Sequence, residues 1–242
     1  MNITVNQIQK HHKIEARHRS DFGSYLSDMI FGASDGIVTT FAIVAGAIGA
    51  NFPTTVIIIL GFANLLADGI SMALGNYIGK KSERDFNRGQ RQQEEWEIEN
   101  MREAEIKEVK DSLQAWGFTG QDLKRATETI ISDKKRWVDF MMREELNIFE
   151  EGAGAPSRHG LATFFAFSIA GLAPIIPYLT PWPSFGASIT SACITLFIIG
   201  ALKNLITPKK WYVSGLEMLI VGVLAGSSAY FVGNILEHII MK

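Results

Sequence analysis

The fold is decided by the stretch PTTVIIILGFANLLADGISMALGNYIGKKSER, residues 53–84. About 20 mostly apolar residues are enough for a helix to cross the hydrocarbon core of a bilayer, and residues 53–78 meet that requirement. The stretch then enters Lys80, Lys81 and Arg84 without a loop signal. This pattern predicts a transmembrane helix that continues directly out of the bilayer into water.

Four further windows of the same kind flank this stretch. One precedes it at residues 29–50, and three follow at residues 160–180, 184–202 and 213–236. The sequence therefore predicts an all-α polytopic membrane protein with five transmembrane helices. Its expected divisions are an N-terminal segment (1–28), transmembrane helices 1 and 2 (29–79), a helical insert (80–159) and transmembrane helices 3 to 5 (160–242).

The charged residues are concentrated in the insert. Between Lys80 and His159 lie 18 of the 25 acidic residues and 15 of the 23 basic residues. A net charge of −2, with no basic stripe interleaved with aromatic residues, gives no indication of a nucleic-acid partner. The single cysteine, Cys193, lies in an apolar run, which excludes a disulfide framework within one chain.

Lys and Arg in the short flanks predict the orientation in the membrane. They gather on one side of the predicted spans, at Lys10, Lys13, Arg17, Arg19, Lys80, Lys81, Arg84, Lys203, Lys209 and Lys210. The opposite side carries a single Lys242. By the positive-inside rule, the N-terminus and the insert are cytoplasmic and the C-terminus lies on the far side. Residues 1–28 are polar throughout, unlike a cleavable signal peptide, so the first span is expected to remain in the mature protein.

Small residues recur at four-residue intervals in the spans. The pairs are Gly32/Gly36, Ala45/Gly49, Gly75/Gly79 and Gly222/Gly226. Such spacing lets helix backbones approach closely and predicts tight packing, either within one chain or between identical subunits.

The insert is expected to be helical. A first helix is predicted from residue 82 to about 109, followed by a break at 117–120 and helices over 122–131 and 133–149. Asp122 and Ser132 are suitable N-caps for the last two helices. Residues 151–156 form the expected linker back to the membrane.

Two carboxylates stand well inside predicted spans, whereas a third, Glu217, lies close to the start of the fifth span and is expected at the membrane interface. Asp35 lies one turn inside the first span, and Asp68 lies in the second with Asn64 and Met72 on the same helical face. An ionised carboxylate in a span costs several kcal/mol unless it faces a partner, water or an ion. An ion or proton site is the leading interpretation, and a structural hydrogen bond to a neighbouring helix is the alternative.

The ligand types in these spans favour a particular class of ion. Carboxylate and amide oxygens together with the Met72 thioether suit Fe²⁺ or Mn²⁺ better than Ca²⁺ or an organic substrate. Because cation binding requires the deprotonated acid, Asp35 could exchange a proton for the metal.

The insert repeats this chemistry outside the membrane. Glu94 and Glu97 are spaced i, i+3, as are Glu105 and Glu108, and between residues 94 and 111 eight acids meet only three bases. Met141 and Met142 lie one turn before Glu145, so that sulfur and carboxylate are offered together. A solvated helix face and a core-filling Met pair are the alternatives. The candidate metal ligands are Glu94, Glu97, Glu105, Glu108, Met141, Met142 and Glu145, with Fe²⁺, Mn²⁺ or Zn²⁺ as the bound ion.

The sequence carries no visible apparatus for enzyme chemistry. It has no nucleophilic triad, no phosphate-binding glycine loop and no Glu-x-x-His di-iron motif, and the acidic helix contains no histidine. Neither catalysis nor a prosthetic group is expected.

Three motifs together resemble the vacuolar iron transporter family. They are SDGIV at residues 34–38, ADGISMALGNY at residues 67–77 and WVDFMMREE at residues 137–145. The resemblance extends from about Tyr25 to the C-terminus and includes the insert after the second span.

The resemblance implies a function and a set of roles. It implies a homodimer with the ion path at its interface, and a cytoplasmic metal-binding insert that supplies Fe²⁺ to a proton-coupled exporter. Asp35 and Met72 are the implied ion-path pair, and the seven Glu and Met residues of the insert are its implied ligands. Asn64 stands where plant members carry a glutamate, with Asp68 nearby, so the proton relay is expected to be rearranged.

The expected location is the cytoplasmic (inner) membrane of a bacterium, because no organelle-targeting extension is visible. A manganese-selective exporter and a membrane-anchored metal buffer or sensor remain as alternatives, and so does a membrane-bound ferritin-like oxidase. The buried carboxylates argue against a mere anchor, and the lack of histidine ligands argues against the oxidase.

Overall fold

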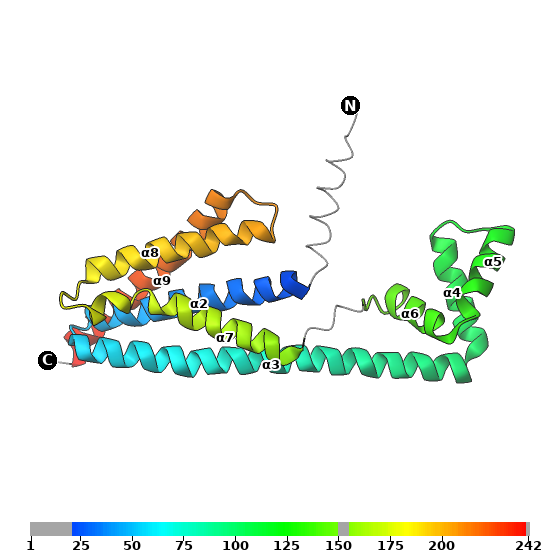
Figure 1. The fold of residues 1–242 in the computed structure, drawn as a ribbon, viewed down its shortest axis with the longest axis horizontal. Helices are drawn as coiled ribbons and strands as arrows, with labels where there is room; N and C mark the ends of the chain where they lie inside the picture. The colour runs from blue at the N-terminus through cyan, green and yellow to red at the C-terminus, as the bar shows by residue number, and fades with distance from the viewer. Residues whose placement is uncertain (1–20, 150–154, 241–242) are drawn as a thin grey trace, which may run out of the picture. The chain divides into compact units, whose positions relative to one another are not determined.

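The structure, a computed structural model, describes residues 21–149 and 155–240. Every regular element in these two stretches is a helix and none is a strand, which confirms the all-α prediction (Figure 1). The chain divides into two compact units. Unit 1 comprises the residues up to Ile78 and those from Gly154 onward, and unit 2 comprises Gly79–Ala153.

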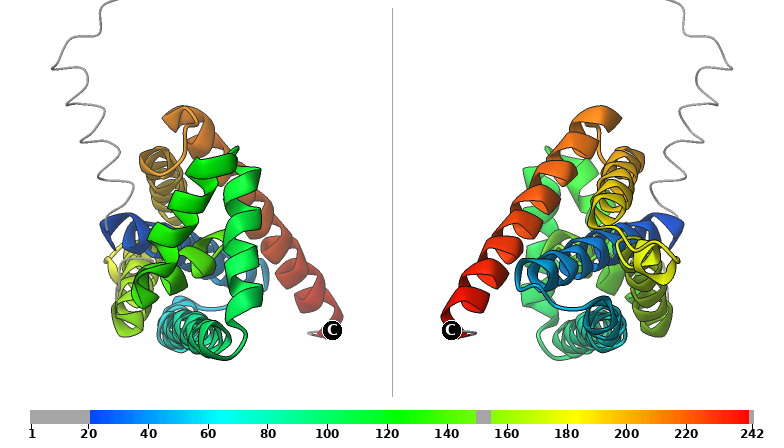
Figure 2. Two further views of the ribbon diagram at one scale, coloured as in Figure 1. Left: turned by 90° about the vertical axis from the view of Figure 1, so that its right-hand side faces the viewer. Right: turned by 90° about the vertical axis from the view of Figure 1, so that its left-hand side faces the viewer.

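Unit 1 is a bundle of long helices around α2. Its elements are α2 (Asp21–Gly49), the first part of α3 (Thr54–Asn100), α7 (Pro156–Leu172), η1 (Ile176–Leu179), α8 (Phe185–Leu202), η2 (Lys203–Leu205) and α9 (Trp211–Ile240). Helix α2 packs against α7, α8 and α9, and the end-on views show it among them (Figure 2). Asn51, with a φ of 54°, forms the turn between α2 and α3.

Four of the described helices, α2, α3, α8 and α9, are long and apolar enough to cross a membrane. They correspond to the predicted windows 29–50, 53–78, 184–202 and 213–236, three of which extend one residue beyond the helix. The remaining window, 160–180, is divided between α7, which ends at Leu172 after 17 residues, and η1. Pro174 and Pro177 interrupt it, because proline cannot continue an α-helix. The count of five spans therefore stays a prediction.

Helix contacts in unit 1 are closest at glycines. A methyl group on Gly36 would overlap the backbone of Phe167 in α7, and one on Gly49 would overlap that of Tyr230 in α9. A methyl group on Gly226 would likewise overlap the side chain of Phe41. The prediction of tight packing within the chain is wrong for the pair Gly75/Gly79: in the described part of the chain no atom lies within 4 Å of a methyl group placed on either.

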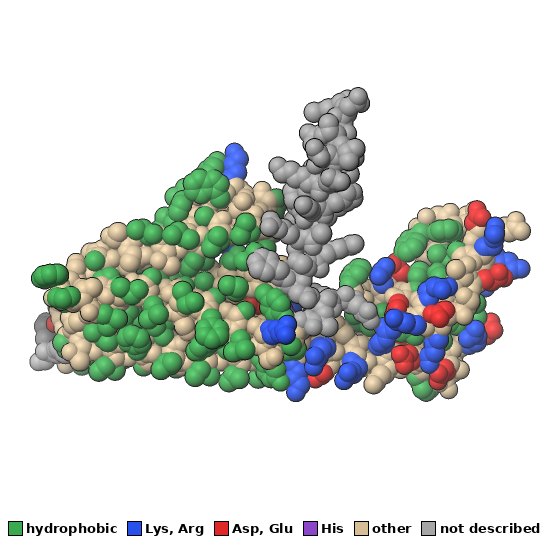
Figure 3. Space-filling view, viewed as in Figure 1, with side chains coloured by type: hydrophobic (Ala, Val, Ile, Leu, Met, Phe, Trp, Pro, Cys, Tyr) green, Lys and Arg blue, Asp and Glu red, His purple; other side chains and the backbone are tan. Residues whose placement is uncertain are grey.

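Unit 2 is built from the second part of α3 with α4 (Arg102–Ala115), α5 (Gly120–Ile131) and α6 (Lys134–Glu144). Its core consists of Ile98, Val109, Leu113, Trp137, Val138, Met141 and Met142. On the face shown in Figure 3, charged side chains crowd the surface of unit 2, whereas the coloured side chains of unit 1 are mostly hydrophobic.

The helix expected to leave the second span is confirmed, because α3 runs unbroken from Thr54 to Asn100. The prediction that this helix extends to about residue 109 is wrong. It breaks at Met101, with φ −124° and ψ 32°, and α4 follows. The break turns the chain so that Ile98 of α3 and Val109 of α4 are buried in one core. A straight helix would keep these two side chains apart and would lose the free energy of burying them together.

The predicted break at residues 117–120 is confirmed, and Gly117 and Gly120 both have positive φ there. The predicted N-caps are wrong by one to three residues. Thr119 precedes α5, and Asp133 caps α6 by accepting a hydrogen bond of 2.8 Å from the backbone N–H of Arg136. The last predicted helix ends at Glu144 rather than at residue 149.

Two predicted segments fall largely outside the described residues. Residues 1–20 include the basic flank Lys10, Lys13, Arg17 and Arg19, and residues 150–154 include most of the expected linker. Helix α7 begins at Pro156, so His159, expected at the end of the insert, lies within α7 in unit 1.

Candidate metal centre and ion path

Three glutamates from three segments of unit 2 meet at one place. Glu94 lies in α3, Glu105 lies one turn into α4, and Glu145 is the C-cap of α6. One carboxylate oxygen from each lies within 4.8 Å of the others. The break at Met101 makes this meeting possible, because it redirects the chain between the first two glutamates.

The glutamate cluster is unusual because two of its members are buried. Glu94 is 2% exposed and Glu105 is 4% exposed, and each has a buried carboxylate oxygen with no hydrogen-bond partner in the described residues. Buried acids normally have partners, since a charge removed from water is costly. Two unpartnered oxygens, from Glu94 and Glu105, that converge with a carboxylate oxygen of Glu145 fit the coordination of a divalent cation.

Burial is the largest cause of the perturbed titration of these acids. Burial, followed by the charges of the neighbouring glutamates, raises the pKa of Glu94 to about 7. The pKa of Glu105 is raised to about 7 by burial and then by Glu108, Glu97 and Glu145. Burial also raises the pKa of Glu145, as do the charge of Glu108 and a hydrogen bond with it. Glu97 and Glu108 therefore lie close enough for their charges to raise the pKa values of the three clustered glutamates.

Met141 and Met142 lie in the hydrophobic core of unit 2. They are 1% and 6% exposed and belong to one cluster with Trp137 and Val138. Packing accounts for both residues here, as the core-filling alternative expects. Their role as ligands stays a prediction.

The metal-free protein is expected to be less stable at about pH 8 than at about pH 5. In the unfolded chain, Glu94 and Glu105 lose their protons as the pH rises above 4.5. In the folded protein they keep these protons up to about pH 7, because their pKa values are raised. This contribution to stability is complete below the unfolded pKa and is lost as the pH rises through about 7.

Glu94→Gln is therefore expected to raise the thermal unfolding midpoint by about 2 to 4 °C at about pH 8, and to change it little at about pH 5. Scanning fluorimetry of the full chain in detergent with a chelator measures this difference. Glu103→Gln is the control, because Glu103 is an exposed glutamate of unit 2, in the first turn of α4. An equal effect of Glu94→Gln at both pH values would contradict the assignment.

The predicted ion-path residues lie in unit 1 on α2 and α3. Asp35 and Asp68 are half-buried, and they lie close enough for their charges to interact. Asn64 donates a hydrogen bond of 3.4 Å from its amide to the Thr40 hydroxyl, which is fully buried. Met72 packs at the edge of the core cluster that contains Phe167. The two helices thus bring two carboxylates, an amide and a thioether to adjoining faces.

The sequence reasoning missed two features of this region. The first is Asn76, which lies one turn beyond Met72 on the helical face that carries Asn64 and Asp68. Its four-residue spacing from Met72 could have predicted this position from the sequence. The second feature is a contact between Asp28 and His159, which are 131 residues apart, and no local pattern marks it.

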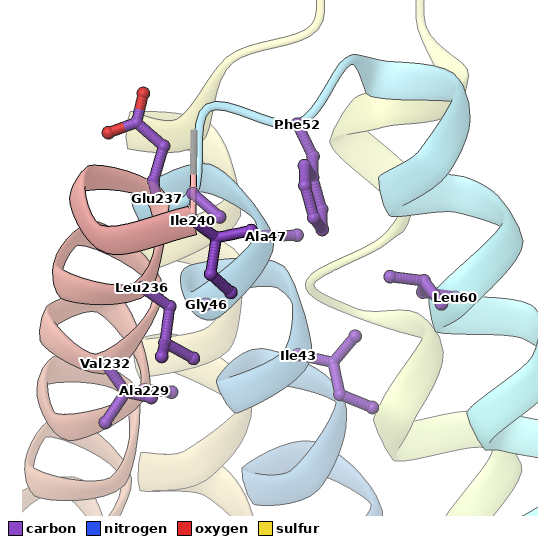
Figure 4. A pocket seen from close by; sticks show the side chains of 12 residues that line it. Ile43, Gly46, Ala47, Phe52, Leu60, Ala229, Val232, Leu236, Glu237 and Ile240 are labelled. Carbon is purple, nitrogen blue, oxygen red and sulfur yellow. The ribbon is translucent and has the colours of Figure 1, made fainter. Parts of the chain in front are cut away.

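An apolar pocket of about 460 Å³ lies between α2, the start of α3 and α9 (Figure 4). Ile43, Leu60 and Leu236 line it, and the charged residue of its lining is Glu237. Glu237 accepts a hydrogen bond of 3.3 Å from the amide of Asn51. A single carboxylate in an apolar lining does not supply a ligand set for a divalent cation, so the pocket adds no second metal centre.

Comparison with known proteins shows that the glutamate cluster of unit 2 and the predicted ion-path residues both lie within the stretch that matches a protein family. The model of the VIT family matches residues 26–234. The chain is 35% identical to the vacuolar iron transporter of Toxoplasma gondii over 237 residues, which cover 92% of this chain and 78% of that protein. It is 34% identical to the vacuolar iron transporter of Plasmodium berghei over 244 residues, 96% of this chain and 88% of that protein. It is 30% identical to vacuolar iron transporter 1 of Arabidopsis thaliana over 219 residues, 89% and 88% of the two chains.

Proposed function

This chain belongs to the VIT family, and we propose that it is a transporter that exports Fe²⁺ from the cytoplasm in exchange for protons. The observation that carries the proposal is the pair of half-buried carboxylates, Asp35 and Asp68, within helices apolar enough to cross a membrane. Such carboxylates are costly unless they face a partner, water or an ion, and a pair of them in one region favours an ion or proton site. The relatives named as iron transporters support iron as the cargo.

The glutamate cluster of unit 2 is the proposed collecting site. Its buried, unpartnered oxygens bind the cation once their protons leave, so that metal capture and proton release are coupled. Glu97, Glu108, Met141 and Met142 are proposed as supporting members of the site. Several carboxylates on one ion supply the charge that compensates for its lost water.

Asp35 and Met72 are the proposed ligands of the ion path, with Asn64 and Asp68 beside them. Oxygen and sulfur donors together suit Fe²⁺, and Mn²⁺ is the competing cargo because it accepts a similar ligand set. When Asp35 releases the metal on the far side, the carboxylate takes up a proton and returns it to the cytoplasmic side.

The proposed membrane arrangement has five spans, with α7 and η1 forming the third. An odd number of spans places the two termini on opposite sides of the membrane. The basic flanks place the N-terminus and the insert in the cytoplasm, and therefore the C-terminus on the far side. The cytoplasmic membrane of a bacterium is the proposed location.

We further propose that two copies pair along α3. Exposed small residues follow one another at four-residue intervals on this helix, at Ala63, Ala67, Ser71 and Gly75. Small residues let transmembrane helices approach closely. Asp68 and Met72 immediately follow members of this stripe, so pairing would place them beside the interface and the ion path between the subunits.

Gly75→Leu is expected to weaken the dimer by about tenfold, because the larger side chain separates two closely packed helices. The fold of unit 1 should be unaffected, since a methyl group on Gly75 meets no atom within 4 Å in the described chain. Light scattering after size exclusion in detergent measures the ratio of dimer to monomer. Gly89→Leu is the control, because Gly89 is equally open but lies in unit 2. An unchanged dimer for Gly75→Leu would exclude this interface.

Competition between Fe²⁺ and Mn²⁺ in vesicles with an acidic lumen identifies the cargo. Fe²⁺ uptake that a large excess of Mn²⁺ barely reduces supports iron, and uptake that equimolar Mn²⁺ suppresses supports a manganese exporter. A protein that binds metal but accumulates none in the lumen would be a membrane-anchored buffer.

A further inference from the structure

A half-buried acid and a buried histidine form an ion-pairing contact at the start of α7. The Nδ1 atom of His159 lies 2.5 Å from Oδ2 of Asp28 on α2. The two side chains are 6% and 15% exposed, so both are largely removed from solvent. The ring of Tyr25 lies against the imidazole with a centroid distance of 4.4 Å, and its buried hydroxyl has no partner in the described residues.

This contact adjoins the proposed ion path through α3. The Asn76 amide donates hydrogen bonds to the Thr163 hydroxyl at 2.7 Å and to the His159 carbonyl oxygen at 3.4 Å. Asn76 lies one helical turn beyond Met72, and Asp28 lies two turns before Asp35 on the same face of α2. The polar faces of α2 and α3 therefore both reach the Asp28–His159 contact.

One proton decides the charge of this buried contact. A carboxylate only accepts hydrogen bonds, so Nδ1 of His159 carries a hydrogen toward Asp28, and exchange occurs at Nε2. With a neutral imidazole the contact carries one negative charge, and with an imidazolium it carries none. Because an uncompensated buried charge is costly, proton binding and release here change the energy of the contact between α2 and α7.

His159 contacts residues of α2 and α3. From α2 it meets Asp28 and Tyr25, whose ring face favours a cation. From α3, the Asn76 amide donates a hydrogen bond to the backbone carbonyl of His159, and Tyr77 lies against the adjacent Gly160. The neighbouring Arg158 on α7 is exposed.

We propose that the Asp28–His159 contact is a proton-binding site of the transport cycle, from which the exchanged proton leaves for the cytoplasm. The proposal rests on the proton-coupled export proposed above. In it, His159 Nε2 receives the proton after metal passage, and its release restores the charged contact before the next ion enters. Histidine suits this step because one ring nitrogen can keep its hydrogen bond to Asp28 while the other binds and releases a proton.

The test is Fe²⁺ uptake into acid-lumen vesicles at saturating metal, with the external pH varied and the pH difference held constant. For the wild type, uptake is expected to fall about tenfold for each pH unit below the midpoint, as the fraction of unprotonated imidazole falls. His159→Gln and Asp28→Asn are each expected to reduce this dependence to less than about twofold per unit. His238→Gln is the control, since His238 is an exposed histidine on α9.

A wild-type pH dependence that persists in both variants would overturn the proposal while leaving proton-coupled export intact. If the wild type itself shows no gradient-dependent uptake, the proposed function fails instead. In that event, nitrogen NMR of the histidine-labelled full chain still decides on the site. A titrating imidazole signal near neutral pH that disappears in His159→Gln supports proton binding, and the absence of such a signal overturns it.

Discussion

Asp35→Asn is expected to reduce Fe²⁺ uptake into acid-lumen vesicles by about 100-fold, equivalent to about 3 kcal/mol of lost ion stabilisation. Asn has nearly the shape of Asp but carries no charge and releases no proton. The variant therefore removes both the negative ligand and the proposed site of exchange. Stopped-flow uptake with a metal-sensitive dye in the lumen measures the loss.

Asp35→Glu is the conservative partner of this variant and should retain measurable uptake, because it keeps a titratable carboxylate. Folding is monitored by the elution volume of each variant in detergent. Uptake by Asp35→Asn at the rate of the wild type would remove Asp35 from the ion path. The alternative that Asp35 only bonds a neighbouring helix would then gain support.

The double variant Glu94→Gln with Glu105→Gln is expected to weaken Fe²⁺ binding to the insert by about 100-fold or more. The substitutions leave the core of unit 2 intact, because Gln is isosteric with the protonated acid that burial favours. Equilibrium titration of the full chain with Fe²⁺ under anaerobic conditions measures this loss. The single variant Glu103→Gln, at an exposed acid of α4, should bind as the wild type does.

The same titration has a predicted pH dependence. With the pKa values of Glu94 and Glu105 raised to about 7, metal competes with protons below neutral pH, and affinity should fall steeply there. Binding that is independent of pH, or equal in the double variant and the wild type, would reduce unit 2 to a charged spacer.

Much of the fold could be predicted from apolar length alone. The helix from Thr54 to Asn100 follows from an apolar run that enters charged sequence without a loop signal. The break at Met101 could not be predicted, because no proline or glycine marks it and the burial of Ile98 with Val109 determines it. The predicted window at residues 160–180 forms the least regular structure of the five, since its two prolines divide it between α7 and η1.

In the candidate sites, too, features set by local helical spacing could be predicted from the sequence, and contacts between distant segments could not. Helical spacing on the sequence pointed to Glu94 and Glu105, but it could not show that both are buried or that Glu145 joins them. The core position of Met141 depends on packing from α3 and α4. The contact between Asp28 and His159 joins segments separated by the whole insert, and only the folded chain brings them together.

Fe²⁺ accumulation against its concentration gradient tests proton-coupled export most directly. Vesicles containing the wild-type protein, with an acidic lumen and equal Fe²⁺ inside and outside, should accumulate the metal until the pH difference is spent. Dissipating the pH difference with an ionophore should stop the accumulation, and protein-free vesicles should show none. Accumulation that is unchanged without the pH difference, or no accumulation at all by the wild type, would contradict proton-driven transport.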